Sequence, residues 1–145
     1  DPAAAGASPT VRTTAPPTAR VETRKERAAE YLGSFSDAAL FDDDASPQSH
    51  AFEWIVHRDI GAGRVEVPDV GASDPRFVQR YALAVLYYAT ADLLYEAGHQ
   101  NFKREFDFLS AKHECEWYDK LEYTPAEEVF YYGVSCDDRG RVISI

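Results

Sequence analysis

The sequence contains no methionine, only two cysteines and no long apolar run. Without a methionine there is no initiator, so we expect the chain to be a processed product or a piece of a longer protein. No stretch approaches the roughly 18 apolar residues that a membrane-spanning helix needs. The N-terminus also has no hydrophobic signal core. We therefore expect no membrane insertion within this segment and any targeting segment to have been removed.

Local motifs of several large enzyme classes are also absent. The sequence has no P-loop, no dinucleotide-binding fingerprint and no nucleophile elbow. The acidic run Asp42–Asp44 lacks the spaced ligands and central glycine of a calcium-binding loop, and His50, His57 and His99 stand singly. An enzyme would need a polar cleft that gathers such groups, and no spacing requires one. We expect a non-catalytic protein without a cofactor or a bound metal.

The charge balance of the chain is strongly acidic. Its 25 acidic and 15 basic side chains give a formal net charge of −10. An acidic body repels phosphate backbones, so we expect no nucleic-acid partner, whereas cationic surfaces remain possible partners. A length of 145 residues with 45% hydrophobic content suits one domain with a single core.

Residues 1–21 differ in composition from the rest of the chain. They consist mainly of alanine, proline, threonine and serine, with too few large apolar side chains to offset the entropy of ordering. They predict a disordered linker or stalk. Pro16-Pro17 among threonines also suits an O-glycosylated spacer. The folded domain is then expected to cover residues 22–145.

Three helices are predicted in this domain, over residues 22–33, 46–57 and 74–90. At Ser46-Pro47 a capping serine precedes a proline at the first helical position, and Asp74-Pro75 repeats this arrangement. The third segment is apolar nearly all round, so we expect it to form the buried centre of the fold.

The C-terminal part has the β-branched and aromatic composition of two short strands, residues 129–136 and 142–145, joined by a turn at 137–140. These strands predict a hairpin. The predicted fold class is therefore mainly α with a short C-terminal β-hairpin, an α+β fold. The last strand lacks a second neighbour, so we expect further protein to stack on its edge.

The spacer at residues 118–131 is expected to protrude as a loop. Aromatic side chains gather around it, and amphipathic rings are frequent at interfaces. The residues expected to contact a protein partner are Trp117, Tyr118, Tyr123, Tyr131 and Tyr132. The alternative is that most of these rings belong to the core.

Cys115 and Cys136 are expected to form a disulfide. A loop of this length would contribute roughly 3 kcal/mol by restricting the unfolded chain, and a disulfide is compatible with an oxidising compartment. Two reduced thiols are an alternative. A metal site formed with His113 is another, although it lacks a clear fourth ligand, and a Cys–His catalytic pair lacks a glycine-rich oxyanion turn.

Several segments occur together in a recognisable order. Residues 39–55 and 79–90 are followed by Cys115-Glu116-Trp117 and by Gly133-Val134-Ser135-Cys136. The last two segments are similar to the Cys-x-Trp and Gly-Val-x-Cys pattern of plant-type repeat caps. Together, the segments resemble the N-terminal capping region of extracellular leucine-rich-repeat proteins, particularly the form abundant in diatom sequences. The longer spacer between Trp117 and Gly133 departs from related caps.

The resemblance implies a helical cap domain at residues 22–145 that leads into the first strand of a repeat solenoid and shields its apolar end from water. It implies a non-catalytic capping and protein–protein recognition module of a secreted or membrane-anchored, receptor-like protein, outside the cell or at its surface. The expected partners are the following leucine-rich repeats of the same parent chain and a protein that the sequence does not identify.

An alternative function is an independent small binding subunit. It would dock a partner strand at its hairpin edge, by β-augmentation, and contact the partner through the aromatic loop 118–132. A parent reading frame that continues into leucine-rich repeats of about 24 residues would favour the cap instead.

Overall fold

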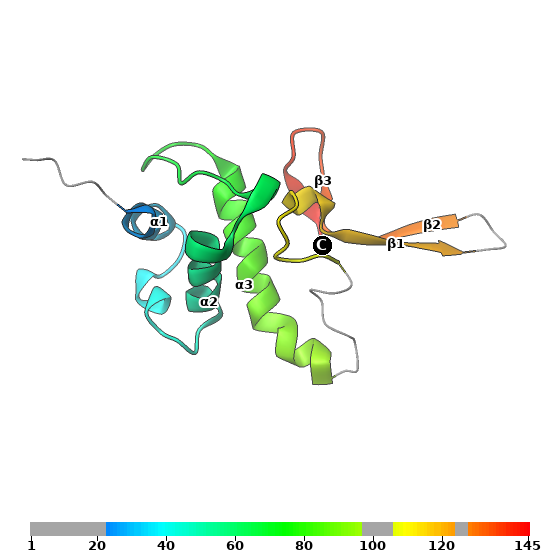
Figure 1. The fold of residues 1–145 in the computed structure, drawn as a ribbon, viewed down its shortest axis with the longest axis horizontal. Coiled ribbons are helices and arrows are strands. Elements are labelled where there is room, and N and C mark those ends of the chain that lie inside the picture. The colour runs from blue at the N-terminus through cyan, green and yellow to red at the C-terminus, as the bar shows by residue number, and fades with distance from the viewer. Residues whose placement is uncertain (1–22, 97–105, 124–127) are drawn as a thin grey trace, which may run out of the picture.

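The computed structural model describes residues 23–96, 106–123 and 128–145, and the predicted linker at residues 1–21 lies outside them. A helical body is followed by a β-rich end (Figure 1). The main elements are α1 (Arg24–Leu32), α2 (Pro47–Glu53), α3 (Pro75–Glu96), β1 (Tyr118–Tyr123), β2 (Glu128–Gly133), β3 (Ser135–Cys136) and β4 (Val142–Ser144). This order confirms the predicted α+β fold class.

Each of the three helices begins at a residue whose side chain caps it. The side-chain oxygens of Thr23, Ser46 and Asp74 accept hydrogen bonds of 3.3, 2.9 and 3.0 Å from backbone amides of the following first turn. These bonds satisfy amides that have no partner within the helix, which is why the capping residues fix where the helices start. The predicted starts at Ser46 and Asp74 are confirmed.

The ends of the second and third helices add detail that the sequence did not supply. After α2 the chain continues through one π-helical turn, η2 (Trp54–Arg58), whose first three residues are all buried. Helix α3 runs beyond the predicted end at residue 90. It is not buried all round, because Ala82 and Ala89 are exposed.

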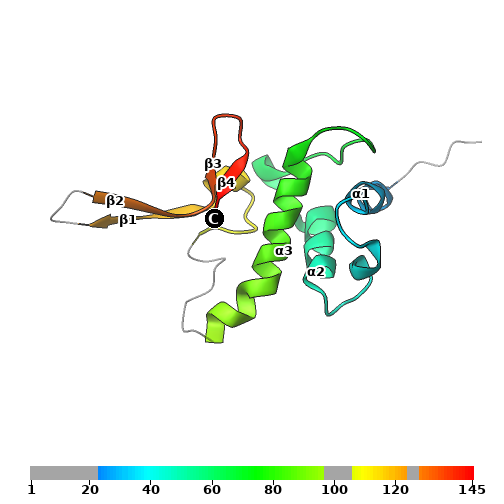
Figure 2. The same cartoon turned by 180° about the vertical axis from the view of Figure 1, so that it is seen from behind.

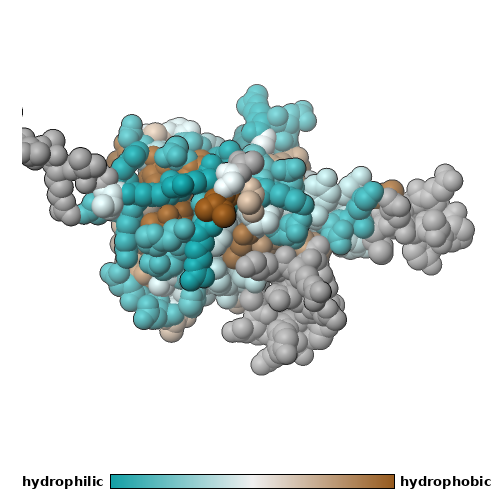
Figure 3. Space-filling view, in the orientation of Figure 1, coloured by the Kyte–Doolittle hydropathy of each residue, from teal (hydrophilic) through white to brown (hydrophobic). Residues whose placement is uncertain are grey.

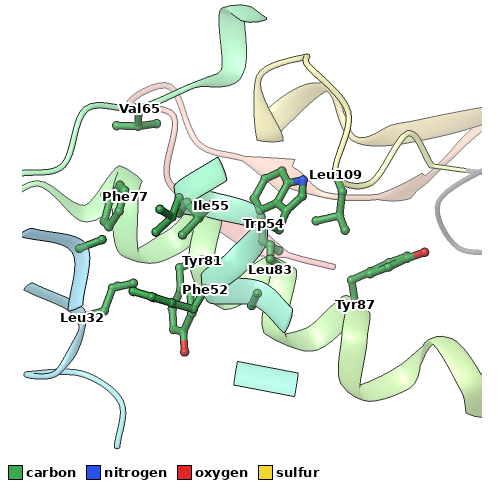
Figure 4. Close-up of a cluster of buried hydrophobic side chains, with 14 of the residues drawn as sticks. Leu32, Phe52, Trp54, Ile55, Val65, Phe77, Tyr81, Leu83, Tyr87 and Leu109 are labelled. Atoms are coloured by element: carbon green, nitrogen blue, oxygen red, sulfur yellow. The ribbon is translucent and has the colours of Figure 1, made fainter. Parts of the chain in front are cut away.

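The core lies between α2 with its π-helical turn, α3 and the end of α1 (Figure 4). Phe52 on α2 stacks on Phe41 with ring centroids 4.7 Å apart, and Phe41 meets the edge of Tyr81 on α3. Phe77 and Leu83 are also buried. Helix α3 therefore contributes to the core along much of its length, as the sequence predicted for the central helix.

The β-rich end contains two separate two-stranded antiparallel sheets, β1 with β2 and β3 with β4. The second is the predicted hairpin, with its turn closed by a bond of 2.9 Å from the Gly140 amide to the Asp137 carbonyl. The first hairpin corrects the prediction of a loop at residues 118–131. The predicted strand 129–136 is also interrupted, because Gly133 has a φ of +112°.

Candidate interaction surface

The disulfide between Cys115 and Cys136 is present, with an S–S distance of 2.03 Å. It joins the short helix η4 (Glu114–Glu116) to β3. Both sulfurs are used in this bond, so the alternatives of free thiols and of a cysteine metal site are wrong. Within the described residues, no group of three or more histidine, cysteine or acidic side chains is arranged to hold a metal ion.

A fully buried arginine, Arg80 on α3, lies beside the disulfide-bonded segment. Its Nε and Nη2 donate to the Asp59 carboxylate at 3.0 and 2.7 Å, and its Nη1 donates to Glu114 Oε2 at 3.1 Å. The remaining N–H groups donate to the carbonyls of Ser110 and Lys112, each at 3.2 Å. Every guanidinium donor thus has an acceptor, which offsets the cost of burying the charge.

Two tryptophan rings enclose the same guanidinium. Its central carbon lies 5.1 Å from the ring centroid of Trp54 and 4.7 Å from that of Trp117. A cation over an indole face is attracted by the negative face of the ring, and the attraction is stronger where water is excluded. The rings therefore stabilise the charge and fill the space around it.

Glu114 is buried together with Arg80. Burial by itself raises the pKa of its carboxyl group, but hydrogen bonds from Arg76 and from the backbone, with the charges of Arg76 and His113, outweigh that effect and hold the pKa below its ordinary value. The bond from Arg76 Nε to Glu114 Oε1 is 3.1 Å long. Glu114 is thus a carboxylate that two arginines share.

The Arg80 cluster, comprising Arg80, Asp59, Glu114 and Arg76, joins three distant parts of the chain. It links α3 to the segment that follows η2 and to the turn that carries Cys115. It therefore holds the disulfide-bonded end against the helical body. The sequence interpretation missed it, although one signal was present: Arg80 follows Phe77 by three residues and so lies on the apolar face of α3.

Trp117 corrects one of the predicted partner contacts. Its side chain has no exposed surface, and its ring packs 5.3 Å from Phe108 and 5.9 Å from Trp54. Trp117 belongs to the core, as the alternative interpretation predicted for most of these aromatic residues. A partner cannot reach it, because Arg80 and these rings surround it on the inside of the fold.

Gln79 places the C-terminal hairpin on α3. Its Nε2 donates to the Gly140 carbonyl at 3.1 Å, and its Oε1 accepts from the Val142 amide at 2.7 Å. One side-chain amide thus holds both the turn and the first residue of β4. Together with the disulfide on β3, this fixes the position of both strands of the hairpin.

The outer edge of β4 is open. Its inner edge pairs with β3, Ser144 opposite Ser135 and Val142 opposite Cys136, so that Ile143 falls at an irregularity in the register. No other strand in the described residues pairs with β4. The Ile143 side chain is 66% exposed, and Ile145 is exposed as well. The hairpin therefore presents backbone groups and apolar side chains to a neighbour.

Comparisons of this chain with models of protein families, with curated proteins and with solved structures find no match. Among the helices that the structure describes, none combines the length and apolar character needed to cross a bilayer. The disulfide is typical of proteins that mature in an oxidising compartment.

The tyrosines of the first hairpin form the other exposed surface. Tyr118, Tyr131 and Tyr132 are exposed, and the rings of Tyr118 and Tyr131 meet at 5.7 Å between centroids. The backbone of Tyr123 belongs to β1, but its side chain lies outside the described residues. Three of the five predicted contact residues are thus available to a partner, on a hairpin that projects from the body (Figure 2).

The remaining polar candidates have local structural roles. His113 Nδ1 accepts a hydrogen bond of 3.2 Å from the Cys115 amide and caps η4. Within the exposed run Asp42–Asp44, Asp43 accepts a bond of 3.1 Å from the Ala45 amide in the turn that precedes α2. These contacts account for both groups without a ligand.

Proposed function

We propose that this chain is the N-terminal cap of a leucine-rich-repeat protein that works outside the cell or at its surface. The observation that carries the proposal is the open outer edge of β4, where Ile143 is exposed while the strand itself is held by β3 and Gln79. A preformed edge of this kind is suited to receive the next parallel strand of a solenoid. In such a protein β4 is the first strand of the repeat sheet.

The helical body supports this role physically. The first repeat of a solenoid has no preceding repeat to cover its apolar side, so a capping element must do so. Here β3 pairs with one edge of β4 and Val142 packs against the core of the body, while the other edge of β4 is unpaired among the described residues. The disulfide agrees with a location outside the cytoplasm.

The test is to join the chain, in the register of β4, to an array of consensus leucine-rich repeats that lacks its own cap. We expect the fusion to be monomeric and to unfold in one transition, because β4 covers the end of the array. Ile143→Lys should weaken this coupling. Val70→Lys is the matched control, because Val70 is 61% exposed and lies beside Arg27 and Glu30 of α1.

The proposal fails if the array aggregates as it does without a cap, or if body and array unfold in two independent transitions. It also fails if Val70→Lys and Ile143→Lys have equal effects, because the edge of β4 then has no special role.

A second candidate function is an independent binding subunit that takes up a partner strand at the β4 edge. The exposed tyrosines of the first hairpin favour it, since they offer a second contact surface beside that edge. In this case, two independent transitions are expected from the fusion. The parent reading frame would also not continue into leucine-rich repeats.

A further inference from the structure

The hairpin of β1 and β2, here called the ribbon, leaves the body and returns to it at one point. The Val134 amide donates to the Trp117 carbonyl at 2.9 Å, and Tyr118 pairs with Gly133. A side chain at Gly133 would place its Cβ 2.5 Å from that carbonyl oxygen, so only glycine permits this close approach. The two ends of the ribbon therefore meet, so that removal of residues 118–132 would leave the chain able to close.

The ribbon takes little support from the body. Its strands pack chiefly against each other, and it extends away from the helices in both views (Figures 1 and 2). A two-stranded hairpin alone is marginally stable in water, because it has no second layer to bury its side chains. Tyr131 is accordingly 67% exposed. None of the ribbon's described side chains belongs to the buried core cluster, which leaves their surface for contact with another molecule.

The charge of the ribbon selects the kind of partner. Its two strands carry three acidic residues, Asp119, Glu122 and Glu128, against one basic residue, Lys120, on a chain with a net charge of −10. A second copy of this chain, a nucleic acid or an anionic lipid surface would be repelled. A basic surface would be attracted.

The tyrosine rings and the open edges of the ribbon favour a partner that is both basic and extended. The exposed rings of Tyr118, Tyr131 and Tyr132 offer faces on which lysine or arginine side chains pack favourably. The described part of the ribbon is mainly pale to teal in Figure 3, with one small brown area toward its outer end, as expected for a surface of mostly tyrosine and charged residues. In the described residues β1 and β2 pair only with each other, so each keeps one edge open to an added strand.

We propose that the ribbon is a docking arm for a basic, extended segment of another protein. The segment lies along one edge of the ribbon, with its basic side chains over the tyrosine rings and near the acidic residues. This role is independent of the proposed capping function, because it uses a different hairpin and a different open edge.

A labelled peptide of alternating lysine and valine residues tests the proposal by fluorescence anisotropy with the full chain at about 0.15 M salt, where long-range attraction between exposed charges is screened. We expect it to bind the full chain. A glutamate–valine peptide of equal length should not bind, and proline in place of every second valine should abolish binding, since proline cannot donate to an edge.

Three variants show whether binding occurs at the ribbon. Removal of residues 118–132, and separately the double substitution Tyr131→Ala with Tyr132→Ala, should each weaken binding about tenfold or more, which corresponds to about 1.4 kcal/mol. Phe35→Ala is the matched control and should have no effect, since Phe35 is 60% exposed but lies after α1. The double substitution keeps the test valid if the shortened chain does not fold.

Equal binding by all variants would overturn the proposal, because the general acidity of the body would then explain the attraction. Equal binding of the glutamate peptide would do the same. Dimerisation of the full chain that the deletion abolishes would show that a second copy is the occupant instead. Each of these outcomes leaves the capping proposal unaffected.

Discussion

Arg80 joins the helical body to the disulfide-bonded end of the chain. Its guanidinium is buried between two tryptophan rings and donates to Asp59, Glu114 and two carbonyl groups. Burying a charge without such partners costs several kcal/mol, so the buried arginine and the buried carboxylates depend on one another. The cluster therefore fixes the position of the β-rich end relative to the helical body.

Glu114→Gln tests this cluster. The substitution keeps the size of the side chain but removes the charge that Arg76 and Arg80 share. We expect a loss of about 3 to 5 kcal/mol in the free energy of unfolding, because one partner of a buried pair is removed. Urea denaturation measures it. Glu30→Gln, at an exposed position on α1, is the control and should change stability by no more than about 0.5 kcal/mol. Equal losses in both variants would contradict the account.

The same carboxylate predicts an acid dependence of stability. Its pKa is lowered in the folded protein relative to an ordinary glutamate, which is about 4.3 in the unfolded chain. The Glu114 carboxylate therefore binds a proton less readily in the folded state than in the unfolded state. The resulting stabilisation is fully present above the unfolded pKa and is lost as the pH falls through the lower folded pKa. Unfolding of wild type and Glu114→Gln, measured from pH 7 to pH 3, should show a steeper acid loss in the wild type. Parallel profiles would contradict this.

Among the helices and strands, the sequence predicts features that neighbouring residues determine. It does not predict contacts between residues that are distant in the sequence. The capped helix starts at Ser46 and Asp74 were predictable, because the cap is made within a few residues. The Arg80 cluster was not, because Arg80 and Glu114 are 34 residues apart and nothing in a single sequence pairs them.

The ribbon shows a second limit of the sequence. A hairpin is usually recognised by apolar residues that alternate toward a buried face. Residues 118–123 read Tyr-Asp-Lys-Leu-Glu-Tyr and give no such face. The described side chains of this hairpin lie outside the core cluster, so the alternation that marks a half-buried strand is weak. The sequence therefore predicts a loop here instead of a hairpin.

The disulfide links η4 to β3 and can be removed by two conservative substitutions. Cys115→Ser with Cys136→Ser should lower the free energy of unfolding by about 3 kcal/mol, since the unfolded chain regains the freedom of a loop closed across 21 positions. The cluster around Arg80 should keep the chain folded at room temperature. Thermal unfolding measured by circular dichroism checks both points. An unchanged midpoint, or alkylation of two cysteines in the native wild-type protein, would contradict the disulfide's role.

At the scale of the whole molecule, α3 lies between α2 on one side and the C-terminal hairpin on the other (Figures 1 and 2). Gln79 from α3 and the disulfide to η4 connect the hairpin to the rest of the chain. The result is a body that places one short strand, β4, with its outer edge unpaired among the described residues. This placement is the physical basis of the proposed capping role.

Hydrogen exchange at the β4 amides tests that role most directly. The measurement compares Ile143 and Ser144 in the chain alone with the same residues when leucine-rich repeats follow in register, because the Val142 amide already donates to Gln79. If β4 is the first strand of the repeat sheet, amides that now face outward gain a hydrogen-bond acceptor, and their exchange should slow about a hundredfold or more. Unchanged exchange at both positions would show that no strand pairs with β4, and would contradict the capping function.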